Sequence, residues 1–168
     1  SGIENLSKNQ QPSNKFQMLS LLGKFVETNS NVFTKKAGEK SELGFHIPND
    51  AESVDVHIMN MKNEVMDVIK LGRLSKGDQS CVWRGVSEDG GEIENGDYRF
   101  KIVARDNKGQ VLDVKSSIQG KVTGVNFTDE GVQVAVGKNK LKFDDIVSIR
   151  NVEDPEQKVK NEGLQIGA

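Results

Sequence analysis

Polar and apolar residues alternate at every second position through most of this chain, a pattern that predicts half-buried β-strands. The clearest case is SVDVHIMN, in which Val54, Val56 and Ile58 share one face, whereas Asp55 and His57 point to the other. Glycine, asparagine, aspartate and proline interrupt the alternating stretches at short intervals. The chain is therefore predicted to be all-β, with many short strands joined by tight turns.

Most of these strands lie between residues 24 and 116. Residues 24–36 are predicted to form a hairpin around Asn29-Ser30-Asn31, and a second hairpin is predicted around the turn at 106–109. The other predicted strands of this region are 44–48, 53–60, 63–72, 79–83, 98–105 and 110–115. About seven short strands over residues 40–115, with no competing helical segment, are typical of an antiparallel β-sandwich of immunoglobulin or fibronectin type III kind.

Four more short strands follow Ser117. They are predicted at 119–128, 131–137, 139–143 and 145–152. Four strands of this length rarely form a stable unit alone, and the hairpin at 24–36 would complete a small barrel. We therefore expect a discontinuous barrel made of residues 18–38 plus 117–152, with the sandwich of residues 39–116 inserted into it.

Helical periodicity is confined to one segment near the start of the chain. Phe16, Leu19 and Leu22 are spaced three apart, and Gly23 is a plausible end of a short helix. Residues 1–17 are polar and aperiodic, so they are predicted to be a disordered lead-in. The polar residues 153–168 are predicted to be a disordered tail.

Composition and charge exclude several classes of function. The 168 residues carry a formal net charge of −2, with both signs interspersed, so no basic face is predicted for nucleic acid. No apolar run approaches 18 residues, which argues against membrane insertion. The chain starts with Ser-Gly-Ile-Glu rather than Met, and we expect it to be a trimmed or recombinant fragment.

An acidic stretch, WRGVSEDGGEIENGDYRF, is the first candidate for a metal site. Its acids are Glu88, Asp89, Glu92, Glu94 and Asp97. Calcium needs six to eight oxygens around one point, and these acids do not follow the spacing of an EF-hand loop. The stretch is therefore interpreted as a solvated loop between two strands, with no metal predicted.

Catalytic residues are the second possibility. Asp144 and Asp145 are adjacent, so on a strand they would face opposite ways. His46 and His57 lack further ligands at motif spacing, and Cys81 is interpreted as a buried strand thiol. With no catalytic constellation and no cofactor motif, the chain is predicted not to be an enzyme and to need no cofactor.

The same acidic stretch carries the features that resemble a known family. Trp83-Arg84-Gly85 forms a Trp-x-Gly element, and Asn95-Gly96-Asp97-Tyr98 starts a strand that continues to Phe100. Together with the Val-x-Val-x-Ile strand and the turn Lys76-Gly77-Asp78, over residues 18–152, they resemble the C-terminal half of flagellar hook-capping proteins. The structural signature of the resemblance is Trp83, Gly85, Gly96, Tyr98 and Phe100. Arg84 departs from the family, whose members commonly carry Asp or Asn there.

The resemblance implies a fold and a function. The fold is a fibronectin-like sandwich inserted into a small Tudor-like β-barrel. The function is a non-enzymatic scaffold, or cap, at the distal end of the growing bacterial flagellar hook. Hook subunits and further copies of the chain are the implied partners. The protein would be made in the cytoplasm and exported to the hook tip, and the family's N-terminal region is absent from this chain.

An extracellular ligand- or carbohydrate-binding module is the alternative. Such modules present several aromatic side chains for stacking on sugar faces. This chain has nine aromatic residues, namely one Trp, one Tyr and seven Phe, and Trp83 is predicted to lie in the core. The alternative therefore depends on aromatic residues remaining exposed on the sandwich.

Overall fold

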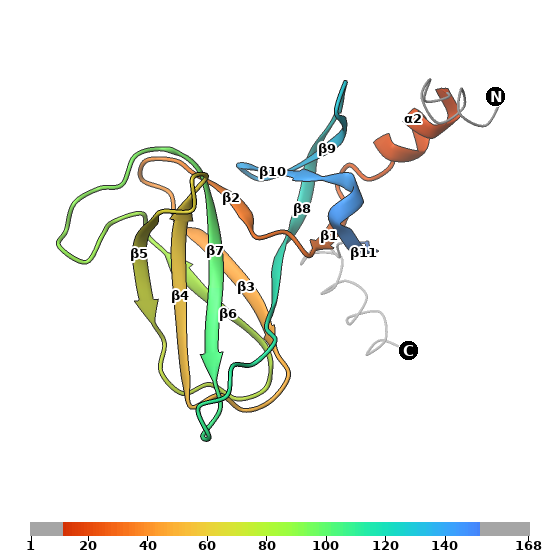
Figure 1. Cartoon of the computed structure of the whole chain (residues 1–168). Coiled ribbons are helices and arrows are strands. Elements are labelled where there is room, and N and C mark those ends of the chain that lie inside the picture. Colours follow the sequence, from red (N-terminus) through yellow and green to blue (C-terminus); the bar gives the residue numbers. More distant parts are fainter. Residues whose placement is uncertain (1–11, 152–168) are drawn as a thin grey trace, which may run out of the picture.

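The computed structural model describes residues 12–151, which form two connected β-structures (Figure 1). The predicted tail at 153–168 and residues 1–11 of the predicted lead-in lie outside the described residues. For residues 12–17 the prediction of disorder is wrong, because they belong to helix α2, which spans Pro12–Leu19. Pro12 is well tolerated in the first turn of a helix, where its missing N–H would have no partner. Farther on, Gly23, at φ +82°, donates its N–H to the Val122 carbonyl (2.9 Å) and leads into the first strand.

The sandwich consists of two antiparallel sheets. One has the order β2-β7-β4-β5, formed by Val32–Lys35, Gly96–Arg105, Ser53–Asn60 and Val65–Lys70. The other pairs β6 (Gly77–Trp83) with β3 (Ser41–Ile47), and β3 with the first residues of β8 (Lys115–Thr128). Burial alternates along β3 and β4 as the sequence pattern predicts.

The barrel half has the strand order β10-β9-β8-β1-β11. These strands are β1 (Phe25–Thr28), β9 (Gly131–Val136), β10 (Asn139–Lys142) and β11 (Ile146–Arg150), with the short 3₁₀ helix η1 (Phe143–Asp145) before β11. The chain thus enters the barrel half, builds the sandwich and returns to the barrel half. The all-β class, with an immunoglobulin- or fibronectin-like sandwich inserted into a Tudor-like barrel, is confirmed.

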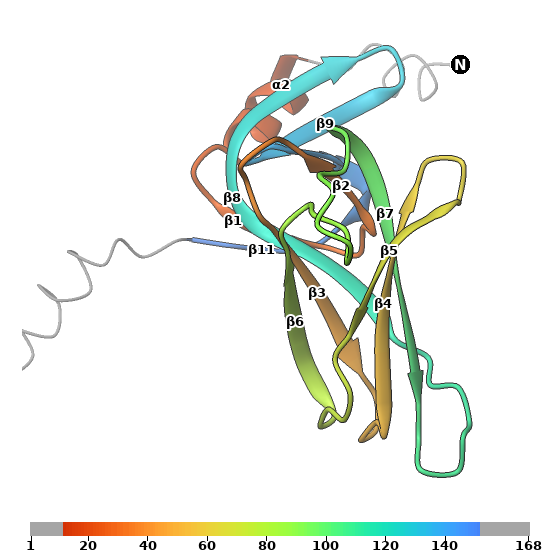
Figure 2. The ribbon, with the colours of Figure 1, turned by 90° about the vertical axis from the view of Figure 1, so that its left-hand side faces the viewer.

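The 14-residue strand β8 belongs to both halves. Its residues 115–117 pair with β3, residues 118–121 pair with β1, and the remainder pairs with β9. Figure 2 shows β8 bending from the sandwich into the barrel half without a break. One hydrogen-bonded strand, rather than a flexible linker, therefore joins the two halves.

One predicted hairpin is wrong, and a second forms only its turn and a single antiparallel bridge. Residues 24–36 do not pair with each other, because β1 pairs with β8 and β11 whereas β2 pairs with β7. The residues between them bridge the two sheets: the Asn29 N–H binds the Asp145 carbonyl (3.0 Å), and the Asn31 carbonyl accepts the Phe100 N–H (3.0 Å). A period of two shows that a segment is a strand but does not identify its partner.

The second hairpin forms its turn but not its returning strand. The Asp106 carboxylate accepts the backbone N–H groups of Lys108 and Gln110, each at 2.9 Å. Beyond the turn, residues 110–115 contribute one isolated bridge, between Arg105 and Val111, and regular pairing resumes only at β8.

The domain limits 18–38 plus 117–152 and 39–116 stay a prediction. Because β2 pairs with β7, we propose that the first limit lies between β1 and β2.

A continuous hydrophobic cluster runs through both halves. From the sandwich it takes the aromatic residues Phe33, Trp83, Tyr98 and Phe100, among others. From the barrel half it takes the aliphatic residues Val26, Ile118, Val122, Val134, Val136 and Leu141, with Leu21 from the turn after α2. A second, smaller cluster closes the far end of the sandwich around Phe45, Ile47 and Val54. The shared cluster makes the two halves one packed unit.

Candidate functional site

The signature residues of the sequence meet at one end of the sandwich. The Trp83 side chain is 2% exposed and lies edge-on to the rings of Phe33 and Tyr98, with both centroid distances 5.6 Å. Its Nε1–H donates to Asp67 Oδ2 of β5 (2.8 Å), so the indole has a partner for its only polar atom. The Tyr98 hydroxyl donates to the Glu94 carbonyl (2.6 Å), and Phe100 is buried beside Phe33.

Gly85 is required by the close approach of a lysine. Its φ is +76°, and a Cβ built there would overlap with Cε of Lys35. The Lys35 side chain is 2% exposed, and its Nζ lies 3.4 Å from Asn95 Oδ1 and 3.7 Å from Glu92 Oε1. Lys35 therefore passes under the loop 84–95 and holds it against β2. Gly96 continues from this loop into β7 at φ +150°, directly opposite Lys35 in the sheet.

The acidic loop contains no gathered ligand set. In residues 12–151, no three His, Cys, Asp or Glu side chains lie together so that they could hold a metal ion. Hydrogen bonds from the Ser87 hydroxyl and the Gly91 N–H hold the pKa of Asp89 below its ordinary value. Asp89 thus stabilises the local turn, and Arg84, where the sequence departs from the family, is exposed.

The other candidate residues are dispersed. Asp144 and Asp145 lie in η1, whereas the prediction placed Asp145 at the start of a strand and Asp144 between two strands. His46 belongs to β3 and His57 to β4, in different sheets. Cys81 is buried, and burial raises the pKa of its thiol to about 11, which keeps it in the unreactive neutral form.

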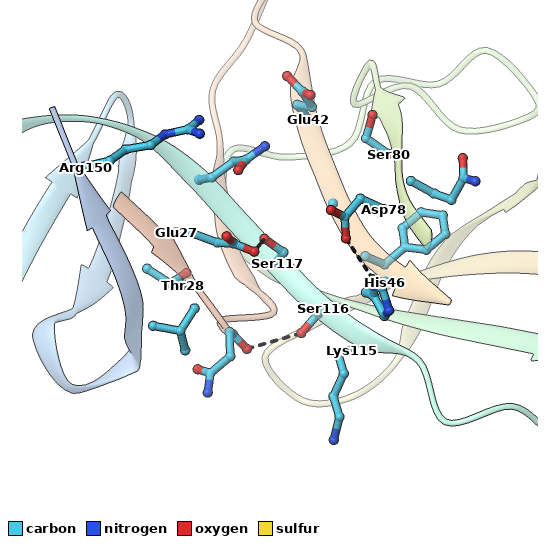
Figure 3. A pocket seen from close by; sticks show the side chains of 16 residues that line it. Glu27, Thr28, Glu42, His46, Asp78, Ser80, Lys115, Ser116, Ser117 and Arg150 are labelled. Atoms are coloured by element: carbon cyan, nitrogen blue, oxygen red, sulfur yellow. Dashed lines mark hydrogen bonds and ion pairs between the residues drawn. The ribbon is translucent and has the colours of Figure 1, made fainter. Parts of the chain in front are cut away.

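A polar groove, not predicted from the sequence, lies between the two halves of the molecule. It has a volume of about 820 Å³. Strands β3 and β6 form one wall, β1 and β11 form the other, and β8 forms the floor (Figure 3). Gly44 permits the close approach of β3 to this floor, because a Cβ there would lie 2.8 Å from the Ser117 carbonyl. The groove arises where the two halves diverge from their shared strand.

Both signs of charge line the polar groove. His46 Nδ1 contacts Asp78 Oδ1 (2.8 Å) near Lys115, and Arg150 lies toward the other end in Figure 3. Between them, Glu27 from β1 accepts a hydrogen bond from the Ser117 hydroxyl (3.3 Å). Glu42 from β3 lies on the opposite wall. This arrangement offers hydrogen bonds and ion pairs to a polar segment of another chain.

The polar groove does not assemble a nucleophile with a base. His46 and Asp78 are both exposed, with side-chain exposures of 55% and 96%. Across the described part of the chain, no hydrogen bond links His46 to a serine hydroxyl. The serines instead bond elsewhere: Ser116 to the Asn29 carbonyl and Ser117 to Glu27. The feature that could have indicated the groove is the long strand β8, which starts at Lys115. The predicted strand started at residue 119, four residues too late, so its contact with the sandwich was missed.

No helix among residues 12–151 is both long enough and apolar enough to span a bilayer.

Comparisons with known proteins converge on one family. The FlgD Ig-like domain model matches residues 30–109, which contain the sandwich strands β2 to β7. The basal-body rod modification protein FlgD of Buchnera aphidicola from Schizaphis graminum is 23% identical over 99 residues, covering 59% of this chain and 44% of the relative. The FlgD of B. aphidicola from Acyrthosiphon pisum is 22% identical over 134 residues, covering 80% and 55%. The chain therefore spans about half the length of the curated relatives it matches.

Solved structures show the same fold. The FlgD structure from P. aeruginosa has a TM-score of 0.60 at 18% identity, covering 77% of this chain and 97% of that one. The FlgD structure from Xanthomonas campestris, described as giving insights into the hook capping essential for flagellar assembly, has a TM-score of 0.64 at 16% identity, with coverages of 82% and 98%. The domain match, the relatives and the shared fold agree with the resemblance read from the sequence. Residues 30–109 are thus similar to the FlgD Ig-like domain, and the chain resembles FlgD proteins in sequence and in fold.

Proposed function

We propose that this chain is a non-enzymatic scaffold that caps the distal end of the growing flagellar hook and promotes the assembly of hook subunits. The observation that supports this most directly is the FlgD Ig-like domain at residues 30–109, continued by the barrel half through β8. Hook subunits and further copies of the chain are the proposed partners. The proposed location is the hook tip, reached by export from the cytoplasm.

The physical character of the chain supports a mechanical role. A cap must hold its shape while subunits insert below it. Here the shared core cluster and the unbroken β8 resist movement of one half against the other. Catalysis would require a nucleophile and a base within hydrogen-bond reach, and the candidates His46, Cys81 and Asp144 lie on separate elements. The mixed charge, net −2, favours neither nucleic acid nor a membrane surface as a partner.

The alternative of a carbohydrate-binding module has no support. Five of the nine aromatic side chains are buried, so they are not available to stack on a ligand: Phe33, Phe45, Trp83, Tyr98 and Phe100. The concave surface is lined instead by charged and hydroxyl side chains.

A deletion and complementation experiment tests the proposal. Deleting the gene that encodes the full-length protein should abolish hook elongation, seen by electron microscopy, and the intact gene should restore it. Normal hooks in the deletion strain would overturn the proposed function.

Binding of purified hook subunits tests the role of the polar groove within this function. Replacing both wall carboxylates, Glu27→Lys with Glu42→Lys, should weaken binding of hook subunits in a pull-down. The matched control is Glu130→Lys, an exposed acid at the turn between β8 and β9, which should leave binding unchanged. Equal binding by all three proteins would remove the polar groove from the contact surface.

A further inference from the structure

Lys35 is a buried amine that the proposed function does not use. Among the described residues it is the only charged residue that is buried, and its side chain is 2% exposed. It follows Phe33 at the next core-facing position of β2, where the alternation predicts an apolar side chain. Burying a charged amine is costly unless polar groups compensate it. Lysines in such surroundings are the ones that proteins use as nucleophiles.

Two side chains of the loop 84–95 meet this amine. Lys35 Nζ lies 3.4 Å from Asn95 Oδ1 and 3.7 Å from Glu92 Oε1. The carbonyl carbon of the Asn95 amide, Cγ, is bonded directly to Oδ1, so an amine, an amide and a carboxylate converge on one point. A nucleophile beside a group that can take its proton is the arrangement that proteins use to attack a carbonyl carbon.

The fold holds the amine and the amide together. Lys35 lies opposite Gly96 in the register of β2 with β7, which brings Asn95, the residue before Gly96, beside it. Gly85 leaves room for the lysine, because a Cβ there would overlap with Cε of Lys35. The Ile93 N–H donates to the Gly85 carbonyl (2.9 Å) and fixes the loop over the amine. Groups that are already in contact avoid the entropic cost of finding each other.

We propose that Lys35 and Asn95 react to form an intramolecular isopeptide bond, with Glu92 transferring the protons. The Lys35 ammonium gives a proton to the Glu92 carboxylate, and the neutral Nζ attacks Cγ of Asn95. A new N–C bond forms, and the bond from Cγ to the amide nitrogen breaks. Both protons that Nζ loses pass through Glu92 to the departing nitrogen, which leaves as an ammonium ion. Nothing is oxidised or reduced.

The exposures of the three groups fit these roles. Lys35 is shielded from water, whereas Glu92 is 61% exposed and Asn95 is exposed as well. The released ammonium ion can therefore diffuse into solvent, which prevents the reverse reaction. Each chain forms this bond once and remains modified. The step is thus not turnover catalysis, and it is compatible with a non-enzymatic scaffold.

The bond joins β2 to the residue that precedes β7. In the described part of the chain β2 is a four-residue strand that pairs only with β7, at the edge of its sheet. A covalent link at its last residue prevents this short strand from detaching. The link also closes a ring through residues 35–95, and so restricts the unfolded chain as a disulfide does. Bond formation does not depend on the capping function, because all three groups belong to one chain.

The intact mass of the purified chain is the first test. The isopeptide bond makes the protein lighter by one molecule of ammonia than its sequence requires. Lys35→Met removes the amine but keeps an unbranched side chain for the buried site, and this variant should have its full mass. The matched control is Lys36→Met at the exposed neighbouring position, which should lose ammonia as the unaltered protein does. Full mass of the unaltered protein would overturn the proposal.

Peptide mapping separates this bond from another reaction that loses ammonia. The backbone nitrogen of Gly96 can attack the Asn95 side chain and give a cyclic imide of the same mass. Only the isopeptide bond blocks tryptic cleavage after Lys35 and yields a branched peptide that joins residues 25–36 to residues 85–99. A mass loss without this branched peptide, or one that persists in Lys35→Met, would show the cyclic imide and overturn the proposal.

Replacing Glu92 tests its part in the reaction. The loss of ammonia is followed by intact mass after cell-free synthesis of the chain. Glu92→Gln should slow it by about a hundredfold or more, which is the usual effect of removing a positioned proton-transfer group. Glu94→Gln, an exposed acid of the same loop, is the matched control and should leave the rate unchanged. Equal rates in the two variants would contradict proton transfer by Glu92.

Discussion

The sandwich and the barrel half are packed into one cluster, but they fill it with different side chains. The sandwich contributes the aromatic group Phe33, Trp83, Tyr98 and Phe100, whose centroid distances run from 5.6 to 6.2 Å. The barrel half contributes mainly Val, Ile and Leu. Large rigid rings restrict the geometry of a core more than small aliphatic groups do. The sandwich therefore carries the more specific sequence signal, and the matched family model lies over it.

The difference also shows how the smaller part is stabilised. The barrel half consists of four-, five- and six-residue strands added to part of β8. Strands this short need a shared core to be stable in water. The barrel half obtains one by packing Leu141, Val134 and Val136 into the cluster that contains the sandwich aromatics. We expect the two halves to unfold together.

Removing the central aromatic residue should have the largest effect. Trp83→Ala should lower the free energy of unfolding by about 3–5 kcal/mol, because it leaves a cavity between the sheets. Urea denaturation followed by far-ultraviolet circular dichroism measures the change. Arg84→Ala, at the exposed neighbouring position, should stay within about 0.5 kcal/mol of the unaltered protein. A loss below about 1 kcal/mol for Trp83→Ala would contradict its central place in the core.

A truncation in the barrel half tests whether the core is shared. Leu141→Ala should cost about 2–5 kcal/mol and should still give one transition. Trp83 is the only tryptophan, so its fluorescence reports on the sandwich while circular dichroism reports on both halves. The two signals should move to lower urea together, and Lys140→Ala, on the exposed side of β10, should move neither. A circular-dichroism change that precedes the fluorescence change would show that the halves unfold separately.

The loop 84–95 that covers Lys35 gives a smaller, more local prediction. Gly85→Ala should cost about 2–3 kcal/mol, because its positive φ is unfavourable for alanine and the new methyl group displaces the Lys35 side chain. Gly90→Ala has a similar φ of +89°, but nothing lies within 4 Å of its added Cβ. It should cost only about 1–2 kcal/mol. Equal losses for the two variants, measured by thermal or urea unfolding, would mean that the contact with Lys35 has no energetic role.

The last effect concerns Cys81 and appears only at high pH. Burial raises the pKa of the folded thiol from 9.0 to about 11. The neutral thiol is therefore favoured in the folded state, and its contribution to stability is complete below pH 9 and decreases as the pH rises toward 11. Comparing unfolding of the unaltered protein with Cys81→Ala between pH 7 and 11 isolates this contribution. The two curves should run parallel below pH 9 and converge or cross above it.

Alkylation of Cys81 extends the same comparison between the halves. At pH 8 the two-unit difference between 9.0 and about 11 leaves roughly a hundredfold less thiolate than an ordinary cysteine has. Alkylation should therefore be slow in the folded protein and faster in Leu141→Ala, because a shared core transmits the loss to the sandwich. Unchanged protection of Cys81 in that variant would contradict a shared core.

Local patterning in the sequence predicts many elements of this fold. Strand β4 covers residues 53–60 as predicted, because Val54, Val56 and Ile58 alternate cleanly with polar residues. The strands after Ser117 are likewise placed correctly within a few residues. In these segments each residue's environment is determined by its own face of the sheet, so the period of two is sufficient evidence.

Pairing between distant strands could not be predicted in the same way. The stretch 24–36 has a good turn between two alternating segments, yet the hydrogen bonds of Asn29 and Asn31 go to Asp145 and Phe100. The polar groove was missed for a related reason. Its walls come from strands that meet only because β8 is shared, and no local pattern around Glu27, Glu42 or Ser117 indicates that they face one cavity.

The direct pairing of β1 with β11 determines how the molecule responds to force. Phe25, the first residue of β1, lies opposite Arg150, the last residue of β11, and the Arg150 guanidinium is stacked 4.3 Å from the Phe25 ring centroid. Tension applied where the chain enters at Phe25 and leaves at Arg150 acts at the same end of this ladder. The ladder would unzip one pair at a time, starting at Phe25 and Arg150, which is the mechanically weak direction for a pair of strands. The sandwich lies outside this load path, so a pull at these two points opens the barrel half first and reaches the sandwich only afterwards.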